Sequence, residues 1–336
     1  MTITNNNLYF KSKNNPKATI VLLQMGGPYS QDLIKPFLIN LFSDPDIIRL
    51  PFIIKPLQGF IARMITRKRL NFVKGNYQLI GGGSPIFQHT SGLAEKIFHE
   101  MESQGYDVDV TFVMRYSEPR ADRIVHMLKE RGIKKLVLFP LYPHYSGSTT
   151  GSSVRDFERS LSKHHDSEIL TIDDWSEESF YINWWIEQIK SELDSLKASD
   201  KKTKIVFSVH GLPKRYIDKG DPYYNSIKSA VEVITRNFPN TEYVLAFQSK
   251  VGPIEWLRPY TVDAVNSVAN KDVNLLFVPL GFVSDHIETL QEIDILYTDQ
   301  AKDLGVETIR RTKVPNDSEQ FAKGITNYLI PYVGGM

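Results

Sequence analysis

The chain has 336 residues and a balanced charge, with 40 Lys and Arg against 39 Asp and Glu. This length predicts about two domains of ordinary size, and the charge balance argues against nucleic acid as a ligand. The chain contains no cysteine. That absence excludes disulfides, thiolate zinc sites, cysteine-ligated iron–sulfur clusters and a cysteine nucleophile.

Residues 1–17 are polar and rich in Asn. They have neither the apolar core of a secretory signal nor the Arg-rich pattern of an organelle transit peptide. No apolar run of the sequence reaches the ~20 residues that span a bilayer. We therefore expect a cytoplasmic protein, with any membrane contact peripheral and at the inner membrane face.

Short apolar runs that end in Gly or Pro turns and precede helical patterns recur along the chain. This alternation predicts an α/β fold with parallel sheets. The predicted strands cover residues 18–24, 108–114 and 135–139 in the first half and residues 204–209, 242–247 and 273–278 in the second half. Open parallel sheets bind ligands outside the carboxyl ends of their strands. We therefore expect two similar Rossmann-like halves, each a doubly wound parallel sheet, with a cleft between them.

We place the first half at residues 17–160 and the second half at residues 161–311. Helical periodicity over residues 173–196 predicts a crossover helix between them. We expect residues 312–333 to form a final helix that returns to the first half.

A basic and hydrophobic lip is predicted within the first half, at about residues 50–77, which include Arg63, Arg67, Lys68 and Arg69. Such a segment can lie on an anionic membrane surface, or it can cover an apolar ligand that carries carboxylates. The alternative is an ordinary amphipathic helix packed on the core.

His210 is a candidate catalytic residue because it ends an apolar strand and precedes a Gly-Leu-Pro turn. This position would present its imidazole at a ligand cleft. The alternative is a structural histidine that is hydrogen-bonded to a backbone carbonyl group.

Acidic residues follow the apolar strand at 273–278. We expect a helix from Ser284 onward, in which Asp285, Glu288 and Glu292 share one face because they are spaced by three and four residues. Carboxylates on a helix usually form a solvated face, but their position after a buried strand favours a role in carrying protons or a cation. Histidine and glutamate together are a ligand set for transient handling of a divalent first-row metal.

Read together, these features resemble the ferrochelatase family, whose members insert ferrous iron into a porphyrin in the last step of haem synthesis. The resemblance covers nearly the whole chain. It is carried by residues 25–28 (MGGP), 81–85 (GGGSP), 115–116 (RY), 142–153 (YPHYSGSTTGSS), 208–213 (SVHGLP), 220–223 (GDPY), 248–253 (QSKVGP), 256–257 (WL) and 284–290 (SDHIETL).

The resemblance implies that the porphyrin lies in the cleft between the two halves. It implies that His210 and Glu288 bind iron or accept protons, and that a supporting group consists of Asp285, His286 and Glu292. Residues implied to hold the propionates or shape the pocket are Arg69, Ser84 and Arg115, with Arg67 as an alternative to Arg69. Residues implied to pack on the macrocycle are Met25, Tyr77, Tyr116, Trp256 and Phe282.

The resemblance also implies which ligands to expect. Met25-Gly26-Gly27-Pro28 resembles the turn of family members that use protoporphyrin. We therefore expect protoporphyrin IX and ferrous iron as substrates, no permanently bound cofactor and, without cysteine, no iron–sulfur cluster. The alternatives are a chelatase for cobalt, nickel or coproporphyrin, and a porphyrin carrier without catalysis.

Overall fold

The computed structural model describes residues 8–13, 16, 18–162 and 167–334. The amino-terminal segment, for which the sequence predicted no targeting signal, lies mostly outside these residues. The chain forms two compact units: unit 1 comprises Met1–Asp174 and Asn316–Met336, and unit 2 comprises Trp175–Pro315. The chain thus crosses between the units after Asp174 and after Pro315, where the sequence suggested residues 160 and 311.

Unit 1 is built on a five-stranded sheet in the order β1-β3-β2-β4-β5. All neighbouring strands are parallel except β1, which is antiparallel to β3. The strands are β1 (Tyr9–Phe10), β2 (Ala18–Gln24), β3 (Val108–Met114), β4 (Lys135–Pro140) and β5 (Glu168–Thr171). Every residue of β2 and β3 is buried, as expected for central strands covered on both faces.

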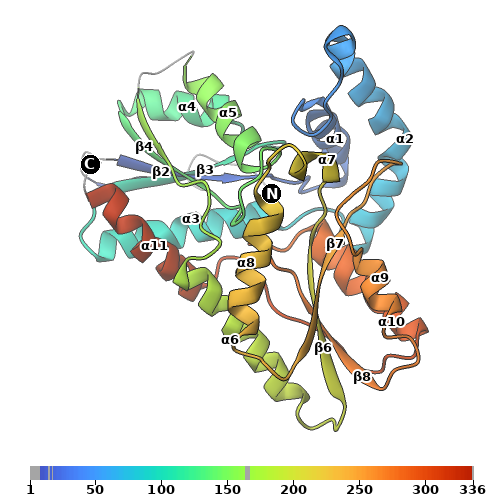
Figure 1. Ribbon diagram of the computed structural model, residues 1–336. Helices are drawn as coiled ribbons and strands as arrows, with labels where there is room; N and C mark the ends of the chain where they lie inside the picture. The colour runs from blue at the N-terminus through green and yellow to red at the C-terminus, as the bar shows by residue number, and fades with distance from the viewer. Residues whose placement is uncertain (1–7, 14–15, 17, 163–166, 335–336) are drawn as a thin grey trace. The chain divides into compact units, whose positions relative to one another are not determined.

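Helices cover both faces of this sheet. Helix α3 packs against β3 and α11, whereas α4 and α5 pack together on the opposite face (Figure 1). The helices of unit 1 are α1 (Ile34–Ser43), α2 (Gln58–Leu79), α3 (Ile86–Ser103), α4 (Ala121–Glu130), α5 (Thr150–Leu161) and α11 (Glu319–Gly334), with 3-10 turns η2 (Gln31–Leu33) and η3 (Phe52–Leu57). The predicted lip therefore consists of η3 followed by α2.

The returning chain is fastened to unit 1 just before α11. Asp317 pairs with His89 Nδ1 at 3.0 Å and with Lys96 Nζ at 3.1 Å, both from α3. Helix α11 then packs along α3, so the carboxyl-terminal segment belongs to unit 1.

Unit 2 contains a four-stranded, all-parallel sheet in the order β7-β6-β8-β9. Its strands are β6 (Lys202–His210), β7 (Glu242–Gln248), β8 (Val273–Val278) and β9 (Ile309–Arg311). Its helices are α6 (Ser179–Leu196), α7 (Lys214–Ile217), α8 (Tyr223–Thr235), α9 (Thr261–Asn266), the π-helix η4 (Glu288–Tyr297) and α10 (Thr298–Asp303). The α/β fold with two parallel-sheet halves is confirmed.

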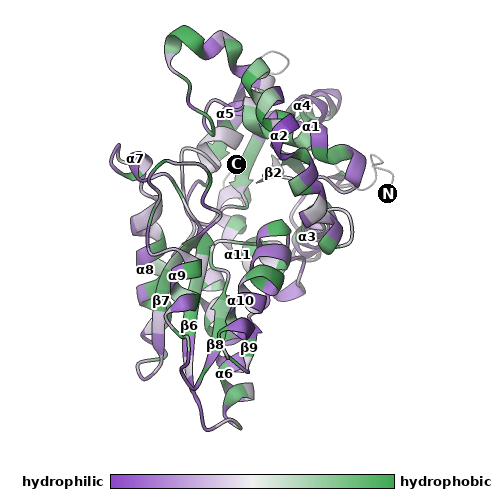
Figure 2. Ribbon diagram, turned by 90° about the vertical axis from the view of Figure 1, so that its right-hand side faces the viewer, coloured by the Kyte–Doolittle hydropathy of each residue, from purple (hydrophilic) through white to green (hydrophobic). Residues whose placement is uncertain are grey.

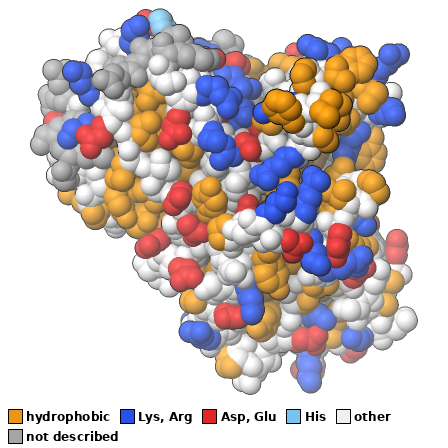
Figure 3. All heavy atoms as spheres, turned by 45° about the horizontal axis from the view of Figure 1, so that its top comes forward, with side chains coloured by type: hydrophobic (Ala, Val, Ile, Leu, Met, Phe, Trp, Pro, Cys, Tyr) orange, Lys and Arg blue, Asp and Glu red, His pale blue; other side chains and the backbone are white. Residues whose placement is uncertain are grey.

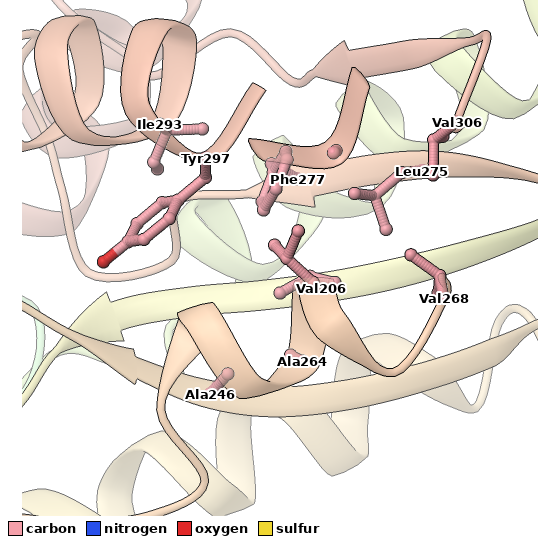
Figure 4. Close-up of a cluster of buried hydrophobic side chains, with 11 residues drawn as sticks. Val206, Ala246, Ala264, Val268, Leu275, Phe277, Ile293, Tyr297 and Val306 are labelled. Atoms are coloured by element: carbon pink, nitrogen blue, oxygen red, sulfur yellow. The ribbon is translucent and has the colours of Figure 1, made fainter. Parts of the chain in front are cut away.

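The core of unit 2 joins the sheet to the helices on one face. Figure 2 shows that β6, β7 and β8 are hydrophobic over much of their length. In Figure 4, Val206, Leu275 and Phe277 of the strands meet Ala264 of α9 and Ile293 of η4. This cluster fixes the π-helix on the sheet next to the ends of β6 and β8. Among the described residues, no helix has the length and apolarity needed to cross a membrane.

We expect Phe277→Ala to lower the free energy of unfolding of unit 2 by roughly 3–5 kcal/mol, because Phe277 is fully buried and its removal leaves a cavity. Urea unfolding followed by tryptophan fluorescence measures this, since all four tryptophans lie between residues 175 and 256. Leu296→Ala, at a side chain with 50% exposure, is the control and should change stability by about 0.5 kcal/mol or less. Equal effects of the two substitutions would contradict this account of the core.

Candidate active site

His210 and Glu288 form the centre of a polar site at the carboxyl ends of the strands of unit 2. His210 is the last residue of β6, and Glu288 begins η4 after β8, the neighbour of β6 in the sheet. His210 Nδ1 and Glu288 Oε2 are 2.8 Å apart. The His210 side chain is 37% exposed and that of Glu288 is 13% exposed. The predicted meeting of two strand ends thus brings these two side chains into contact.

The backbone around His210 is held in place from two sides. The Tyr223 hydroxyl donates to the His210 carbonyl at 2.9 Å, and the Gly211 N–H donates to the Gln248 carbonyl at 3.0 Å. A Cβ atom at residue 211 would lie 2.8 Å from that carbonyl oxygen, so the close approach of this turn to β7 requires glycine. His210 therefore has little freedom to move away from Glu288.

Glu292 lies in a second layer of polar contacts. The Ser249 hydroxyl donates to Glu292 at 2.8–2.9 Å. Gln248 Nε2 donates to the Glu288 carbonyl at 3.0 Å and to Glu292 Oε2 at 3.3 Å. Gln248 and Ser249 were not among the predicted site residues, although both directly follow a predicted strand, as His210 does. Their position directly after a strand would therefore have been enough to predict them.

His286 and Asp285 occupy the segment before the π-helix. His286 Nδ1 donates to the Ser284 carbonyl at 3.0 Å, which leaves Nε2 facing Glu288 Oε1 at 4.0 Å. Asp285 instead pairs with Arg311 at 3.1 Å. The predicted row of three carboxylates on one α-helix is therefore wrong in two respects: Asp285 precedes the helix, and the helix that carries Glu288 and Glu292 is a π-helix.

The four ionisable groups shift one another's pKa values in different directions. Burial lowers the pKa of His210, but the Glu288 carboxylate raises it more, so that it lies above its usual value. Burial raises the pKa of Glu288, but His210 holds it well below its usual range. Burial and the Glu288 charge raise the pKa of Glu292 to about 7. Burial lowers the pKa of His286. Near neutral pH the site can therefore keep Glu288 ionised and still exchange a proton at Glu292.

Two of the aromatic residues predicted to pack on a macrocycle lie beside these groups. The Trp256 ring meets the His210 ring edge-on at 6.4 Å, and the Phe282 ring lies 4.9 Å from the His286 ring. Trp256 also lines a cavity of about 280 Å³, together with Lys214, Tyr224 and Arg258. These half-buried rings can offer apolar surface next to the polar site.

The predicted porphyrin residues of unit 1 differ in accessibility. Arg115 Nη2 pairs with the buried Asp44 at 2.9 Å, and Arg115 is only 10% exposed. The Tyr116 hydroxyl donates to the same Asp44 oxygen at 2.6 Å. Both side chains therefore have partners within unit 1. Asp44 was not found from the sequence, because it follows a helix and has no local signal.

The remaining predicted residues of unit 1 range from buried to exposed. Ser84 is buried, and its hydroxyl accepts the Ile86 N–H at 3.4 Å. Tyr77 is buried near the end of α2, whereas Met25 and Arg69 are half-buried. Arg67, the alternative to Arg69, is exposed. Of the two arginines, Arg69 is thus the one partly enclosed by protein.

No group of three or more His, Asp or Glu side chains that could hold a metal ion occurs among the described residues. His210 and Glu288 supply a nitrogen and an oxygen donor, but these atoms now bond to each other. The site therefore contains two potential metal ligands, one nitrogen and one oxygen atom.

Comparison with known proteins assigns the family. The Ferrochelatase family model matches residues 17–331. This chain belongs to the ferrochelatase family. A ferrochelatase of Geobacter metallireducens is 42% identical over 308 residues, covering 91% of this chain and 95% of its own. One of Gloeobacter violaceus is 39% identical over 322 residues, covering 94% and 97%. The members of this family act on porphyrin and iron.

Solved structures support the fold. SirB from Bacillus subtilis with Fe3+ matches with a TM-score of 0.54 at 9% identity, covering 95% of this chain and 96% of its own. CbiX, a terminal enzyme of sirohaem biosynthesis in denitrifying bacteria, matches with a TM-score of 0.52 at 10% identity, covering 94% and 98%. This chain thus shares its α/β fold with SirB and CbiX.

We expect Glu288→Gln to lower the pKa of His210, because burial remains while the main opposing charge is lost. Titration of the histidine ring signals by NMR measures this. The control is Glu307→Gln, which removes a carboxylate that pairs with Lys201 at the surface and should leave the titration unchanged. An unaltered His210 pKa in Glu288→Gln would contradict the electrostatic description of the site.

Proposed function

We propose that this chain inserts Fe2+ into protoporphyrin IX to give protohaem and two protons. The observation that carries the proposal is the His210–Glu288 pair, 2.8 Å apart at adjacent strand ends, with the imidazole partly exposed. A chain of the ferrochelatase family needs a proton acceptor at the porphyrin nitrogens, and this pair provides one.

Two pyrrole protons have to leave as iron enters. His210 Nδ1 is engaged with Glu288, so in the neutral imidazole Nε2 is the ring atom that can take up a proton from the substrate. The resulting imidazolium is stabilised by the adjacent carboxylate. Glu292, with a pKa of about 7, can hold a second proton at neutral pH. His286, with its lowered pKa, stays neutral and orients its Nε2 toward Glu288.

Metal insertion also requires a bent macrocycle and a partly dehydrated cation. Trp256 and Phe282 offer aromatic surface against which a porphyrin face can pack. Binding energy from such contacts can offset the strain of bending. Iron is then a substrate that passes His210 and Glu288, and we propose that the enzyme keeps no resident metal or cofactor.

The propionates need a cation near the macrocycle. Because Arg115 is held by Asp44, we assign this role to the half-buried Arg69. Arg115, Tyr116, Tyr77 and Met25 would then shape the wall of the pocket.

We expect His210→Ala to bind protoporphyrin IX with near-normal affinity but to lose roughly 100-fold or more in insertion rate, because its role is proton transfer. An anaerobic assay with ferrous iron follows the porphyrin absorbance spectrum. His126→Ala, at an exposed histidine of α4, is the matched control and should remain active.

Each result of this assay has a defined meaning. Turnover by His210→Ala at the rate of the control would contradict the assignment of His210 as the proton acceptor. A wild-type protein that metallates cobalt but not ferrous iron would favour another chelatase activity. Binding of porphyrin without insertion of any metal would favour a carrier.

We also propose peripheral contact between the lip and an anionic membrane. Eight of the thirteen exposed large hydrophobic side chains among the described residues lie in residues 52–79. Phe52 and Ile53 of η3 are 89% and 88% exposed. Figure 3 shows hydrophobic side chains gathered beside Lys and Arg over the end of α2. Apolar side chains next to exposed Arg63 and Lys68 match the chemistry of an anionic lipid surface.

We expect the protein to bind vesicles of phosphatidylcholine and phosphatidylserine more tightly than vesicles of phosphatidylcholine alone. Arg63→Gln should weaken this binding about fivefold, since one basic residue contributes ~1 kcal/mol at such a surface. Ile53→Ser should weaken it as well, whereas Val262→Ser, at a 38% exposed side chain of unit 2, should not. Vesicle sedimentation at low salt measures these differences, and equal binding by all variants would rule out the lip as the contact.

A further inference from the structure

We propose that Arg311 is a positioning residue for the metal-insertion site, an inference that rests on the proposed function. Arg311 ends β9 and lies in register with Phe277 of β8. It belongs to none of the motifs that carry the family resemblance. Its guanidinium nevertheless contacts both the π-helix and the segment just before it, and these two stretches carry Glu288, Glu292 and His286.

The guanidinium of Arg311 holds two carboxylates at once. Nε and Nη2 donate to the two oxygens of Asp294 at 2.6 and 2.9 Å. Nη1 pairs with Asp285 Oδ1 at 3.1 Å. The Arg311 side chain is only 16% exposed. A planar guanidinium with two parallel donors fixes both the distance and the direction of its partner, so Asp294 and Asp285 are tied to the end of β9.

Short contacts lead from Asp285 to the proposed reacting groups. The Thr289 hydroxyl donates to Asp285 Oδ1 at 2.8 Å and accepts the His286 N–H at 3.0 Å. His286 Nε2 in turn faces Glu288 Oε1. Arg311 therefore fixes the point at which the π-helix begins, and that point sets the direction of the Glu288 side chain toward His210.

A π-helix needs such support because its hydrogen bonding is less favourable than that of an α-helix. Asp285 lies just before η4 and Asp294 lies within it. Because the Arg311 side chain bonds to both residues, it opposes conversion of the π-helix into an α-helix. Rewinding would change the angle between successive side chains, so that Glu288 and Glu292 could not both keep their contacts with His210 and Ser249.

The positive charge of Arg311 has a second effect. Asp285 and Asp294 add two negative charges to the part of unit 2 that already contains Glu288 and Glu292. The guanidinium compensates much of this charge in a half-buried region. Removal of the guanidinium would leave both aspartates without their cation.

The test compares Arg311→Met with Arg131→Met. Arg131 forms the same kind of fork on the buried Asp109 of unit 1, with Nε and Nη2 at 2.6 and 3.2 Å from its oxygens. We expect Arg311→Met to lower kcat for iron insertion roughly 10- to 100-fold, as is usual for residues that orient metal-site groups. KM for protoporphyrin should stay within about twofold of wild type, because the macrocycle contacts are untouched. Arg131→Met should lose stability but keep its kcat.

Two further variants separate geometry from charge and guard against misfolding. Arg311→Lys keeps the charge but lacks the fork, so its kcat should lie nearer to that of Arg311→Met than to wild type. Asp294→Asn should also lower kcat, and the Arg311→Met/Asp294→Asn double variant should be no slower than Arg311→Met alone. If Arg311→Met does not fold, Asp294→Asn tests the same clamp.

The outcomes distinguish this inference from the function on which it rests. Wild-type protein that does not insert iron overturns the proposed function. Active wild type with normal kcat in Arg311→Met and Asp294→Asn overturns only the role of Arg311. Full rescue by Arg311→Lys, or strictly multiplicative losses in the double variant, would also overturn the positioning role.

Discussion

The hydrogen bond between His210 and Glu288 is the interaction on which the rest of the site depends. It joins the end of β6 to the first residue of the π-helix after β8, so it requires the parallel pairing of those strands. Burial disfavours the charged form of each group, and the contact with the partner favours it. Removing either partner would leave an unpaired, partly buried charge. The chemistry of the site thus depends on the same pairing of β6 with β8 that builds the sheet of unit 2.

This pair also explains why two glutamates four residues apart behave differently. His210 holds the pKa of Glu288 low, whereas burial and the charge of Glu288 raise the pKa of Glu292 more than the hydrogen bonds from Ser249 and Gln248 lower it. A site with one fixed anion and one carboxyl group that titrates near pH 7 can take up a proton while Glu288 stays ionised. Environment alone sets this division of roles.

The sequence predicted the central strands and the strand-end site, because buried parallel strands are continuous apolar runs and their ends meet at one edge. It did not predict the edge strands β1, β5 and β9, which have two to four residues and no detectable pattern. It also could not distinguish a π-helix from an α-helix, since a spacing of three or four residues suits both. Arg311 and Asp44 have partners distant in sequence, so only the folded chain reveals their contacts.

Arg115 and Tyr116 of unit 1 also directly follow a strand, but their hydrogen bonding differs from that of His210. There a single Asp44 oxygen accepts bonds from Arg115, Tyr116 and Ser152, and the Asp44 side chain is 1% exposed. The Tyr116 and Ser152 hydroxyls both donate to this carboxylate, so their protons are already used within unit 1. At His210 one ring nitrogen is bonded and the side chain remains accessible. Position at a strand end therefore identifies candidate site residues. Which of them can react depends on whether the side chain still has a donor or acceptor atom available to a ligand.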